Sequence, residues 1–193
     1  MFPQQIGVIL TRLEQASFAA YAVGGCVRDT LLGRVPEDWD VTTAARPEQV
    51  SALFAGHCIP TGLRHGTVTV RQDGLSVEVT TFRADGPYSD HRRPDAVYFS
   101  DSLAEDLARR DLTVNAMAMD VQGDITDLYG GRDDLRRGIL RCVGDPDRRF
   151  DEDALRIMRT LRFAAVLGFT VEARTAAALH RCAPLLRDIA AER

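Results

Sequence analysis

The sequence contains no lysine, so all 24 of the positively charged side chains in its 193 residues are arginines. It has no apolar run near the ~20 residues that a membrane-spanning helix requires. Its first residues, MFPQQIGVILTRLEQ, lack the basic start and the cleavage site of a signal peptide. The cysteines are scattered without metal-ligand or redox spacing, at Cys26, Cys58, Cys142 and Cys182. We therefore expect a cytoplasmic protein with reduced thiols and no membrane segment.

The remaining composition is that of an ordinary globular protein, with 45% hydrophobic and 27% charged residues. This balance excludes a disordered or fibrous chain. The net charge of −4 conceals an uneven distribution: residues 1–130 carry 11 arginines against 18 acidic residues, and residues 131–193 carry 13 against 10. An acidic first part suits bound cations, and a basic second part suits an anionic polymer. For the missing lysines, a GC-rich coding bias is the simpler explanation.

Hydrophobic periodicity predicts a mixed α/β part over residues 1–140 and a helical extension over 141–193. We expect helices at 4–17, 27–32, 47–54, 103–108, 151–167 and from about 174 to the end, with a break at Pro184. We expect strands at 21–23, 39–42, 67–71, 75–81 and 140–143, a strand or buried segment at 114–121, and a mobile loop at 84–96. The helical pattern still running at residue 193 suggests a truncated chain.

Within 151–167, four apolar residues are expected to form one face of a helix, and three arginines another. The apolar residues are Leu155, Met158, Leu161 and Val166. The arginines are Arg156, Arg159 and Arg162.

Two glycines, Gly24 and Gly25, lie between a predicted strand and a predicted helix. Such a turn lets the backbone approach a ligand closely, and the start of a helix attracts phosphates. Arg28 can add a charged contact to the same phosphates. A glycine pair is more often plain turn geometry, so the motif alone is weak evidence.

Three carboxylates are candidates for metal and proton chemistry. Asp38 and Asp40 lie two residues apart near a strand, so both can point to one face. Such a pair repels unless a cation intervenes, and Mg²⁺ suits the site when phosphate oxygens complete its shell. Glu78 can join them from a neighbouring strand, as a second metal ligand or a proton acceptor. The alternatives are a solvated acidic strand end for the aspartate pair and an exposed strand residue for Glu78.

A second polar cluster, Arg109-Arg110-Asp111, precedes an apolar segment that contains Asn115. These groups can hold phosphate oxygens and ribose hydroxyls, although Asp111 can equally cap a turn. Asn115 is harder to dismiss, because a buried amide requires partners.

The motif EDALR near the start of the 151–167 helix is expected to place Asp153 and Arg156 together, at i and i+3. A carboxylate beside a guanidinium offers acceptors and donors in one plane, as the edge of a base requires. Acidic residues at a helix start followed by arginines also form ordinary surface pairs.

Taken in order, GGCVRD, DWD, EVTTFR, RRDLTVNAMA, DLYGG and EDALRIMR resemble the motifs of the bacterial tRNA nucleotidyltransferases, the CCA-adding enzymes. Bacterial poly(A) polymerases share most of them, and both groups belong to the DNA polymerase β-like nucleotidyltransferase superfamily. The resemblance spans about residues 20–168. It implies an α+β fold, in which a head with a mixed five-stranded sheet flanked by helices (1–140) precedes an all-helical neck (141–193). The body and tail domains usual in the family are absent.

The resemblance also implies a chemistry. Asp38 and Asp40 would hold two Mg²⁺, and the 3′-hydroxyl of a tRNA would attack the α-phosphate of CTP or ATP and release pyrophosphate. The protein rather than a template would select the base. The implied nucleotide contacts are Gly24, Gly25 and Arg28 for the phosphates, Arg110, Asp111 and Asn115 for phosphate and ribose, Asp153 and Arg156 for the base edge, and Arg159 and Arg162 nearby.

Other functions remain open. The loop 84–96 resembles the flexible loop of enzymes that add the terminal A, which disfavours a CC-adding relative. No basic insertion typical of poly(A) polymerases follows Leu167. The alternatives are a poly(A) polymerase, an A-adding or CC-adding relative, and a non-catalytic RNA- or nucleotide-binding module. Such modules typically lose the metal carboxylates, which are present here.

Overall fold

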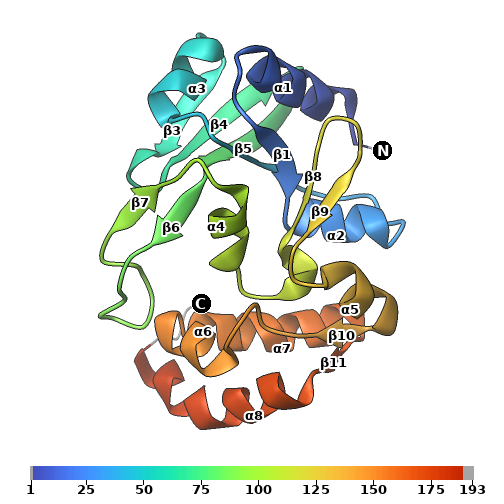
Figure 1. Ribbon diagram of the computed structural model, residues 1–193, viewed down its shortest axis with the longest axis vertical. Coiled ribbons are helices and arrows are strands. Elements are labelled where there is room, and N and C mark those ends of the chain that lie inside the picture. Colours follow the sequence, from blue (N-terminus) through green and yellow to red (C-terminus); the bar gives the residue numbers. More distant parts are fainter. Residues whose placement is uncertain (1, 189–193) are drawn as a thin grey trace.

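A mixed sheet forms the centre of the computed structural model, which describes residues 2–188 (Figure 1). Within these residues seven strands are hydrogen-bonded in the order β3-β4-β5-β2-β1-β8-β9. Their bounds are β1 (Ala20–Val23), β2 (Asp40–Thr43), β3 (Cys58–Gly62), β4 (Thr67–Gln72), β5 (Leu75–Thr81), β8 (Met117–Met119) and β9 (Ile125–Asp127). Only β2 and β5 run parallel, and every other neighbouring pair is antiparallel. The sheet is mixed, as predicted.

The expected count of five strands is wrong, because β3 and β9 extend the sheet at its two edges. β3 contains Pro60 and has three exposed central residues, so its sequence shows no alternation of apolar and polar side chains. Proline and polar residues are common on edge strands, where only one side is hydrogen-bonded. β9 is three residues long and follows a tight turn at Asp120–Gly123. Neither strand carries the pattern that a sequence prediction requires.

The two faces of the sheet are covered differently. On one face lies the main core, in which Val41, Val77 and Val79 pack with the buried side of α1 (Gln4–Gln15) and with α3 (Pro47–Leu53). The expected opening helix is confirmed, and its buried residues are Ile6, Ile9, Leu10 and Leu13. On the other face α4 (Leu103–Ala108) packs Leu107 against Val23 and Ala118. A further helix, α2 (Gly25–Leu31), follows β1.

The polar segment 84–96 is not simply a loop. Its ends belong to a hairpin of β6 (Arg83–Asp85) and β7 (Val97–Phe99). The tip of the hairpin contacts the neck region: His91 Nδ1 lies 2.7 Å from the carbonyl oxygen of Asp151, and Ala154 N donates to the carbonyl of His91 over 2.9 Å. The buried segment expected at 114–121 is confirmed over residues 114–119, of which Met117–Met119 form β8 after a 3₁₀ turn at Thr113–Asn115.

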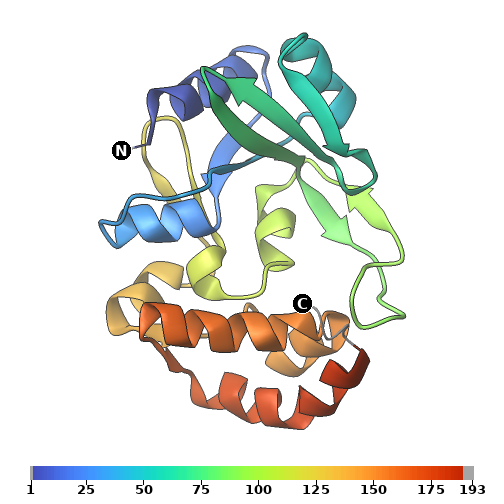
Figure 2. The ribbon, with the colours of Figure 1, turned by 180° about the vertical axis from the view of Figure 1, so that it is seen from behind.

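The described part of the neck region, residues 141–188, packs below the sheet (Figures 1 and 2). The elements around it are α5 (Gly131–Arg137), β10 (Ile139–Leu140), α6 (Pro146–Glu152), α7 (Leu155–Leu167), β11 (Thr170–Val171), α8 (Ala173–Cys182) and a 3₁₀ helix at Ala183–Asp188. It is not all-helical, because β11 pairs in parallel with β10. The break predicted at Pro184 is confirmed, since α8 gives way there to the 3₁₀ helix. The pattern expected at Ala190–Arg193 lies outside the described residues.

The predicted helix 151–167 is wrong in two respects. It is interrupted at Asp153, which separates α6 from α7. Its expected apolar face is also largely exposed: Met158, Leu161 and Val166 are 45%, 48% and 65% accessible. α7 instead buries Arg156, Ile157 and Thr160. The prediction failed because the helix buries the side that carries Arg156, whose guanidinium finds hydrogen-bond partners inside the protein, and not the side that carries Met158 and Leu161.

One hydrophobic core joins the sheet to the neck region. It runs from Ile6 and Val41 through Leu140 to Ile157 and Ala178. No helix within residues 2–188 is long and apolar enough to cross a membrane. All four cysteines are free thiols, as expected.

Candidate active site

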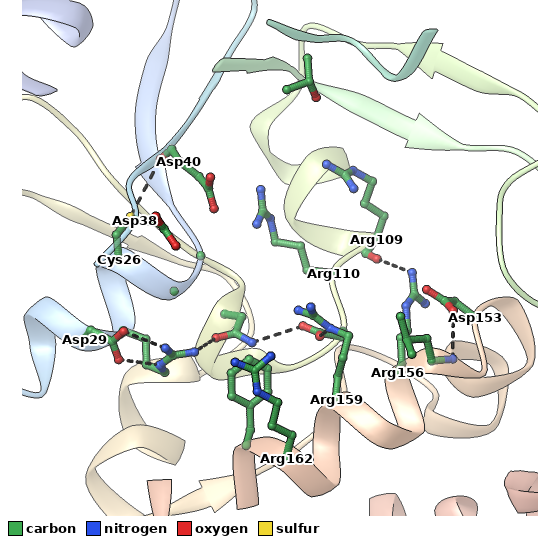
Figure 3. A pocket seen from close by; sticks show the side chains of 18 of the residues that line it. Cys26, Asp29, Asp38, Asp40, Arg109, Arg110, Asp153, Arg156, Arg159 and Arg162 are labelled. Atoms are coloured by element: carbon green, nitrogen blue, oxygen red, sulfur yellow. Dashed lines mark hydrogen bonds and ion pairs between the residues drawn. The ribbon is translucent and has the colours of Figure 1, made fainter. Parts of the chain in front are cut away.

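A cleft of about 1060 Å³ lies between the α4 side of the sheet and α7 (Figure 3). Every residue predicted for the site lines it except Glu78. These residues are Gly24, Gly25, Arg28, Asp38, Asp40, Arg110, Asp111, Asn115, Asp153, Arg156, Arg159 and Arg162. Segments separated by more than a hundred residues in the sequence therefore meet at one surface.

The glycine turn connects β1 to α2 at the wall of the cleft. Gly24 has φ +85° and ψ −132°, a backbone conformation that residues other than glycine rarely adopt. A Cβ atom added to Gly24 would lie 3.3 Å from Nη1 of Arg110. Gly25 already belongs to α2, which begins two residues earlier than predicted. The turn thus places the Gly24 backbone, with no side chain to shield it, beside the guanidinium of Arg110.

The three carboxylates share the face of the sheet opposite the main core. Asp38 and Asp40 are exposed on either side of buried Trp39, although β2 begins only at Asp40. Asp40 is the direct strand partner of Glu78 on β5. Glu78 lines a smaller cavity of about 190 Å³, to which Asp40 also belongs. The expectation that Glu78 lies beside the aspartate pair on a neighbouring strand is confirmed.

The carboxylates repel one another. Although Asp40 stays solvent-accessible, the protein atoms around it in the cleft displace part of its water and raise its pKa, and the negative charges of Glu78 and Asp38 raise the pKa further. The nearby Arg110, whose side chain points toward Asp40 in Figure 3, opposes this shift. A bound cation would relieve the repulsion.

The residues present fit a hard divalent cation. Asp38 and Asp40 offer only oxygen donors, which Mg²⁺ prefers, and both line the cleft. Within residues 2–188 no group of three or more Asp, Glu, His or Cys side chains is placed to hold an ion. Phosphate oxygens of a ligand would therefore have to complete the shell, as is usual for Mg²⁺.

A chain of hydrogen bonds crosses the floor of the cleft from α2 to α7. The guanidinium of Arg28 makes a forked pair with Asp29 at 2.9 and 2.8 Å and donates to Asn115 Oδ1 over 2.7 Å. Asn115 Nδ2 donates to Asp111 Oδ1 over 3.4 Å, and Arg159 Nε donates to Asp111 Oδ2 over 2.8 Å. Burial alone would raise the pKa of Asp111, but Arg159 outweighs it and the pKa is lowered. The buried amide has the partners that it requires.

Phe163 is a site residue that the sequence analysis missed. Its ring centroid lies 5.0 Å from the guanidinium carbon of Arg28 and 5.6 Å from that of Arg159. Both distances are within the range of cation–π attraction. The only sequence signal is its place one turn after Arg159, which any packed helix residue can share. Exposed Arg162 precedes it on the cleft-facing side of α7 (Figure 3).

The expected helical pairing of Asp153 with Arg156 is wrong. Asp153 precedes α7, and its Oδ1 accepts from the backbone N of Leu155, the first residue of that helix, over 3.0 Å. Its Oδ2 accepts from Arg92 of the β6–β7 hairpin over 3.2 Å. Asp153 and Arg156 still share the cleft, but on different elements.

Arg156 is turned toward the protein. Its Nη1 donates to Glu152 Oε2 over 2.7 Å and to the carbonyl of Arg149 over 3.1 Å. Its Nη2 donates to the carbonyl of Arg109 over 3.0 Å. Because a guanidinium has five N–H groups, two of them are left by these bonds.

Comparison with known proteins gives a family match and close relatives. The model of the poly A polymerase head domain matches residues 20–141. The chain is 53% identical to the CCA-adding enzyme of Leuconostoc mesenteroides and 54% identical to that of Lactobacillus helveticus, each over 185 residues. Both alignments cover 96% of this chain but 46% of the relative, so the chain spans less than half the length of these relatives.

Solved structures agree with these matches. The Bacillus stearothermophilus CCA-adding enzyme in complex with CTP superposes with a TM-score of 0.92 at 47% identity, over 100% of this chain and 47% of that one. A tRNA nucleotidyltransferase complexed with a primer tRNA and an incoming ATP analog superposes with a TM-score of 0.73 at 30% identity, over 92% of this chain and 50% of that one.

Proposed function

Because this chain belongs to the poly A polymerase head domain family, we propose that it is the catalytic part of a CCA-adding tRNA nucleotidyltransferase. It would add C and A to the 3′ end of tRNA from CTP and ATP and release pyrophosphate. The observation that carries the proposal is the cleft itself, in which a glycine turn, an aspartate pair and the arginines of α7 converge. The relatives named above, at 53% and 54% identity, support the same activity.

Each wall of the cleft has a proposed role. The backbone of the Gly24–Gly25 turn, with Arg28 and Arg110, would bind the triphosphate. Asp38 and Asp40 would hold Mg²⁺, which when bound neutralises charge on the phosphates during transfer. Glu78 lies beside them, where it can accept the proton of the attacking 3′-hydroxyl. The new bond joins that oxygen to the α-phosphorus, and the bond to pyrophosphate breaks.

Base selection would fall to the α7 side. Asp153 presents a carboxylate at the cleft, and Arg156 keeps two N–H groups after its protein contacts. Together they would offer an acceptor and donors to the edge of a base, with Arg159 and Arg162 beside them. Asp111 and Asn115 would meet the ribose and the phosphates. In this arrangement side chains take the place of a template.

We propose that residues 1–140 form the catalytic head and residues 141–193 the nucleotide-selecting neck. The four free thiols suit the cytoplasm, which we propose as the location. Since the chain spans 46% of its relatives, the tRNA and nucleotide partners are proposed for the whole protein.

The test uses a tRNA transcript that ends before CCA. With CTP alone we expect two added C residues, and with CTP and ATP together a complete CCA end, as sequencing of the product would show. An Asp40→Ala variant serves as the inactive control. Absence of any nucleotide addition by the wild-type chain would overturn the proposal.

A poly(A) polymerase is the second candidate, because the matching family model is described by that activity. Such an enzyme would extend the transcript with A residues when ATP is supplied alone and would ignore CTP. The same set of reactions therefore separates the two activities.

A further inference from the structure

We propose that Asp106 is a positioning residue that holds Arg109 and Arg110 where the triphosphate and the attacking hydroxyl meet. The inference rests on the function proposed above and deepens it. Asp106 lies on α4, outside the motifs, and the sequence analysis did not predict it as a site residue.

One buried carboxylate collects four donors. Asp106 is fully buried, and its Oδ1 accepts from Arg109 Nε over 3.0 Å and Nη2 over 2.7 Å. Its Oδ2 accepts from Arg110 Nη2 over 2.9 Å and from Thr42 Oγ1 over 3.2 Å. The two bonds from Arg109 to one oxygen and the single bond from Arg110 to the other are charge-assisted, and they restrict the orientation of both guanidiniums. The two arginines are therefore held in one arrangement by a single anchor.

The anchor is tied to the strand that carries the aspartate pair. Thr42 follows Asp40 by two residues on β2, so both side chains point to the same face of the sheet. Thr42 is completely buried beside Asp106, whereas Asp40 opens to the cleft. The hydrogen bond from Thr42 thus fixes the position of Asp106 relative to the strand that carries Asp40.

The two arginines occupy the junction of the cavities. Arg109 and Arg110 line both the large cleft and the smaller cavity that contains Glu78. Arg110 Nη1 lies beside the Gly24 backbone, and the charge of Arg110 acts on Asp40. Arg110 is therefore placed between the turn proposed for the phosphates and the carboxylates proposed for the cation.

The neck region holds the same segment from the other side. Arg149 Nη1 donates to the carbonyl of Ala108 over 3.1 Å, and Arg156 Nη2 donates to that of Arg109 over 3.0 Å. The end of α4 is fixed through its carbonyls, while Asp106 fixes the side chains. A site built this way needs little reorganisation when a ligand binds.

Asp106 stays ionised in this setting. Burial alone would raise its pKa, but the positive charges of Arg110 and Arg109 outweigh burial and lower it. Without the carboxylate, two adjacent guanidiniums would repel each other and lose their shared partner. They would then sample many orientations, and fewer would match a triphosphate.

The experiment compares Asp106→Asn with the wild-type 193-residue chain. CTP binding is measured by calorimetry with Mg²⁺ present, and nucleotide addition is measured at varied CTP. We expect the Kd and KM for CTP to rise by about tenfold, the size of a lost charged hydrogen bond, with a smaller change in kcat. Asp147→Asn is the matched control, since it breaks a forked pair with Arg181 that lies outside the cleft. It should leave both constants unchanged.

A double-mutant cycle separates positioning from folding. If Asp106 acts through Arg110, Asp106→Asn combined with Arg110→Gln weakens CTP binding by less than the product of the single effects. Multiplicative effects, or an unchanged Kd in Asp106→Asn, would overturn the proposal. If Asp106→Asn does not fold, Thr42→Val removes one donor at constant shape and should raise the Kd about threefold; no rise would overturn it. A wild-type chain that binds CTP without adding nucleotide would refute the proposed function and leave this test intact.

Discussion

Asp40 on β2 and Glu78 on β5 are direct partners in the one parallel strand pair of the described sheet. Their neighbours Val41 and Val79 pack into the main core, so the two carboxylates face the opposite side. The register of the sheet thus holds two negative charges together, and packing of the opposite face against the core keeps that register in place. The two carboxylates repel each other, and a bound cation would offset this repulsion.

The pH dependence of stability should report this repulsion. Burial and the charges of Glu78 and Asp38 raise the pKa of Asp40, so between the ordinary and the raised pKa the folded state binds more protons than the unfolded state. The contribution of Asp40 to the free energy of unfolding therefore falls as pH rises through that window. We expect Glu78→Gln to reduce this fall in urea unfolding measured upward from about pH 4, the ordinary pKa of an aspartate. Glu48→Gln, an exposed change on α3, is the control, and an equal slope in all three proteins would contradict the prediction.

Asp40→Ala should abolish activity without unfolding the protein. The substitution removes one of two carboxylates proposed to hold Mg²⁺, so pyrophosphate release should slow by at least about 10²- to 10³-fold. The melting temperature should change little, because the carboxylate is repelled by its neighbours and its removal relieves that repulsion. A retained rate would remove the metal assignment.

Phe163→Leu should weaken nucleotide binding. The ring lies near both Arg28 and Arg159, and loss of cation–π contacts is expected to raise the KM for CTP by about three- to tenfold. Phe163→Tyr keeps the ring and should behave as the wild type. Equal KM values for the leucine and tyrosine variants would show that the ring only fills space.

Gly24→Ala and Gly25→Ala should differ sharply in thermal melting. Gly24 has φ +85°, and a Cβ there would press on Arg110 at 3.3 Å, so the free energy of unfolding should fall by about 1–3 kcal/mol. At Gly25 the nearest atom to an added Cβ is Arg28 Nη2 at 3.6 Å, an ordinary contact. Gly25 is helical, and alanine there should cost little or stabilise. Similar losses at both positions would contradict the assigned backbone geometry.

Asp153→Ala should blur the choice between CTP and UTP. Removing the proposed acceptor for the base edge is expected to lower the ratio of kcat/KM for the two nucleotides by about tenfold or more. Asp151→Ala is the control, because Asp151 pairs with His91 of the same hairpin. Unchanged selectivity in Asp153→Ala would assign this residue to its bonds with Leu155 N and Arg92 alone.

The sequence was sufficient to predict the parts of the site that depend on local pattern. Alternation in β5 placed Glu78 on the polar face, and the glycine pair marked the β1–α2 turn. Asp40 begins β2 and Arg110 follows the end of α4, so both lie where the chain meets the cleft, whereas Glu78 and Arg159 project from the middle of β5 and α7. Resemblance added their order and their proposed roles.

The rest depends on contacts between distant segments. Nothing near Asp106 in the sequence reveals that Thr42 donates to it, and nothing near Arg28 reveals the ring of Phe163. α7 was misjudged because periodicity assumes an apolar buried face, whereas Arg156 is buried among carbonyls and Glu152. The edge strands β3 and β9 were not predicted, because strands that are partly exposed to solvent need no alternation of apolar and polar residues.

The uninterrupted core has a consequence for how the molecule can be divided. Leu140 and Ile157 pack in the same cluster as Ile6, and β10 finds its partner in β11. A cut after residue 140 would open that cluster to water and leave β10 with an unpaired edge. The proposed head and neck are therefore expected to unfold together as one cooperative unit. A substitution that weakens packing in the neck would also destabilise the sheet that carries Asp40.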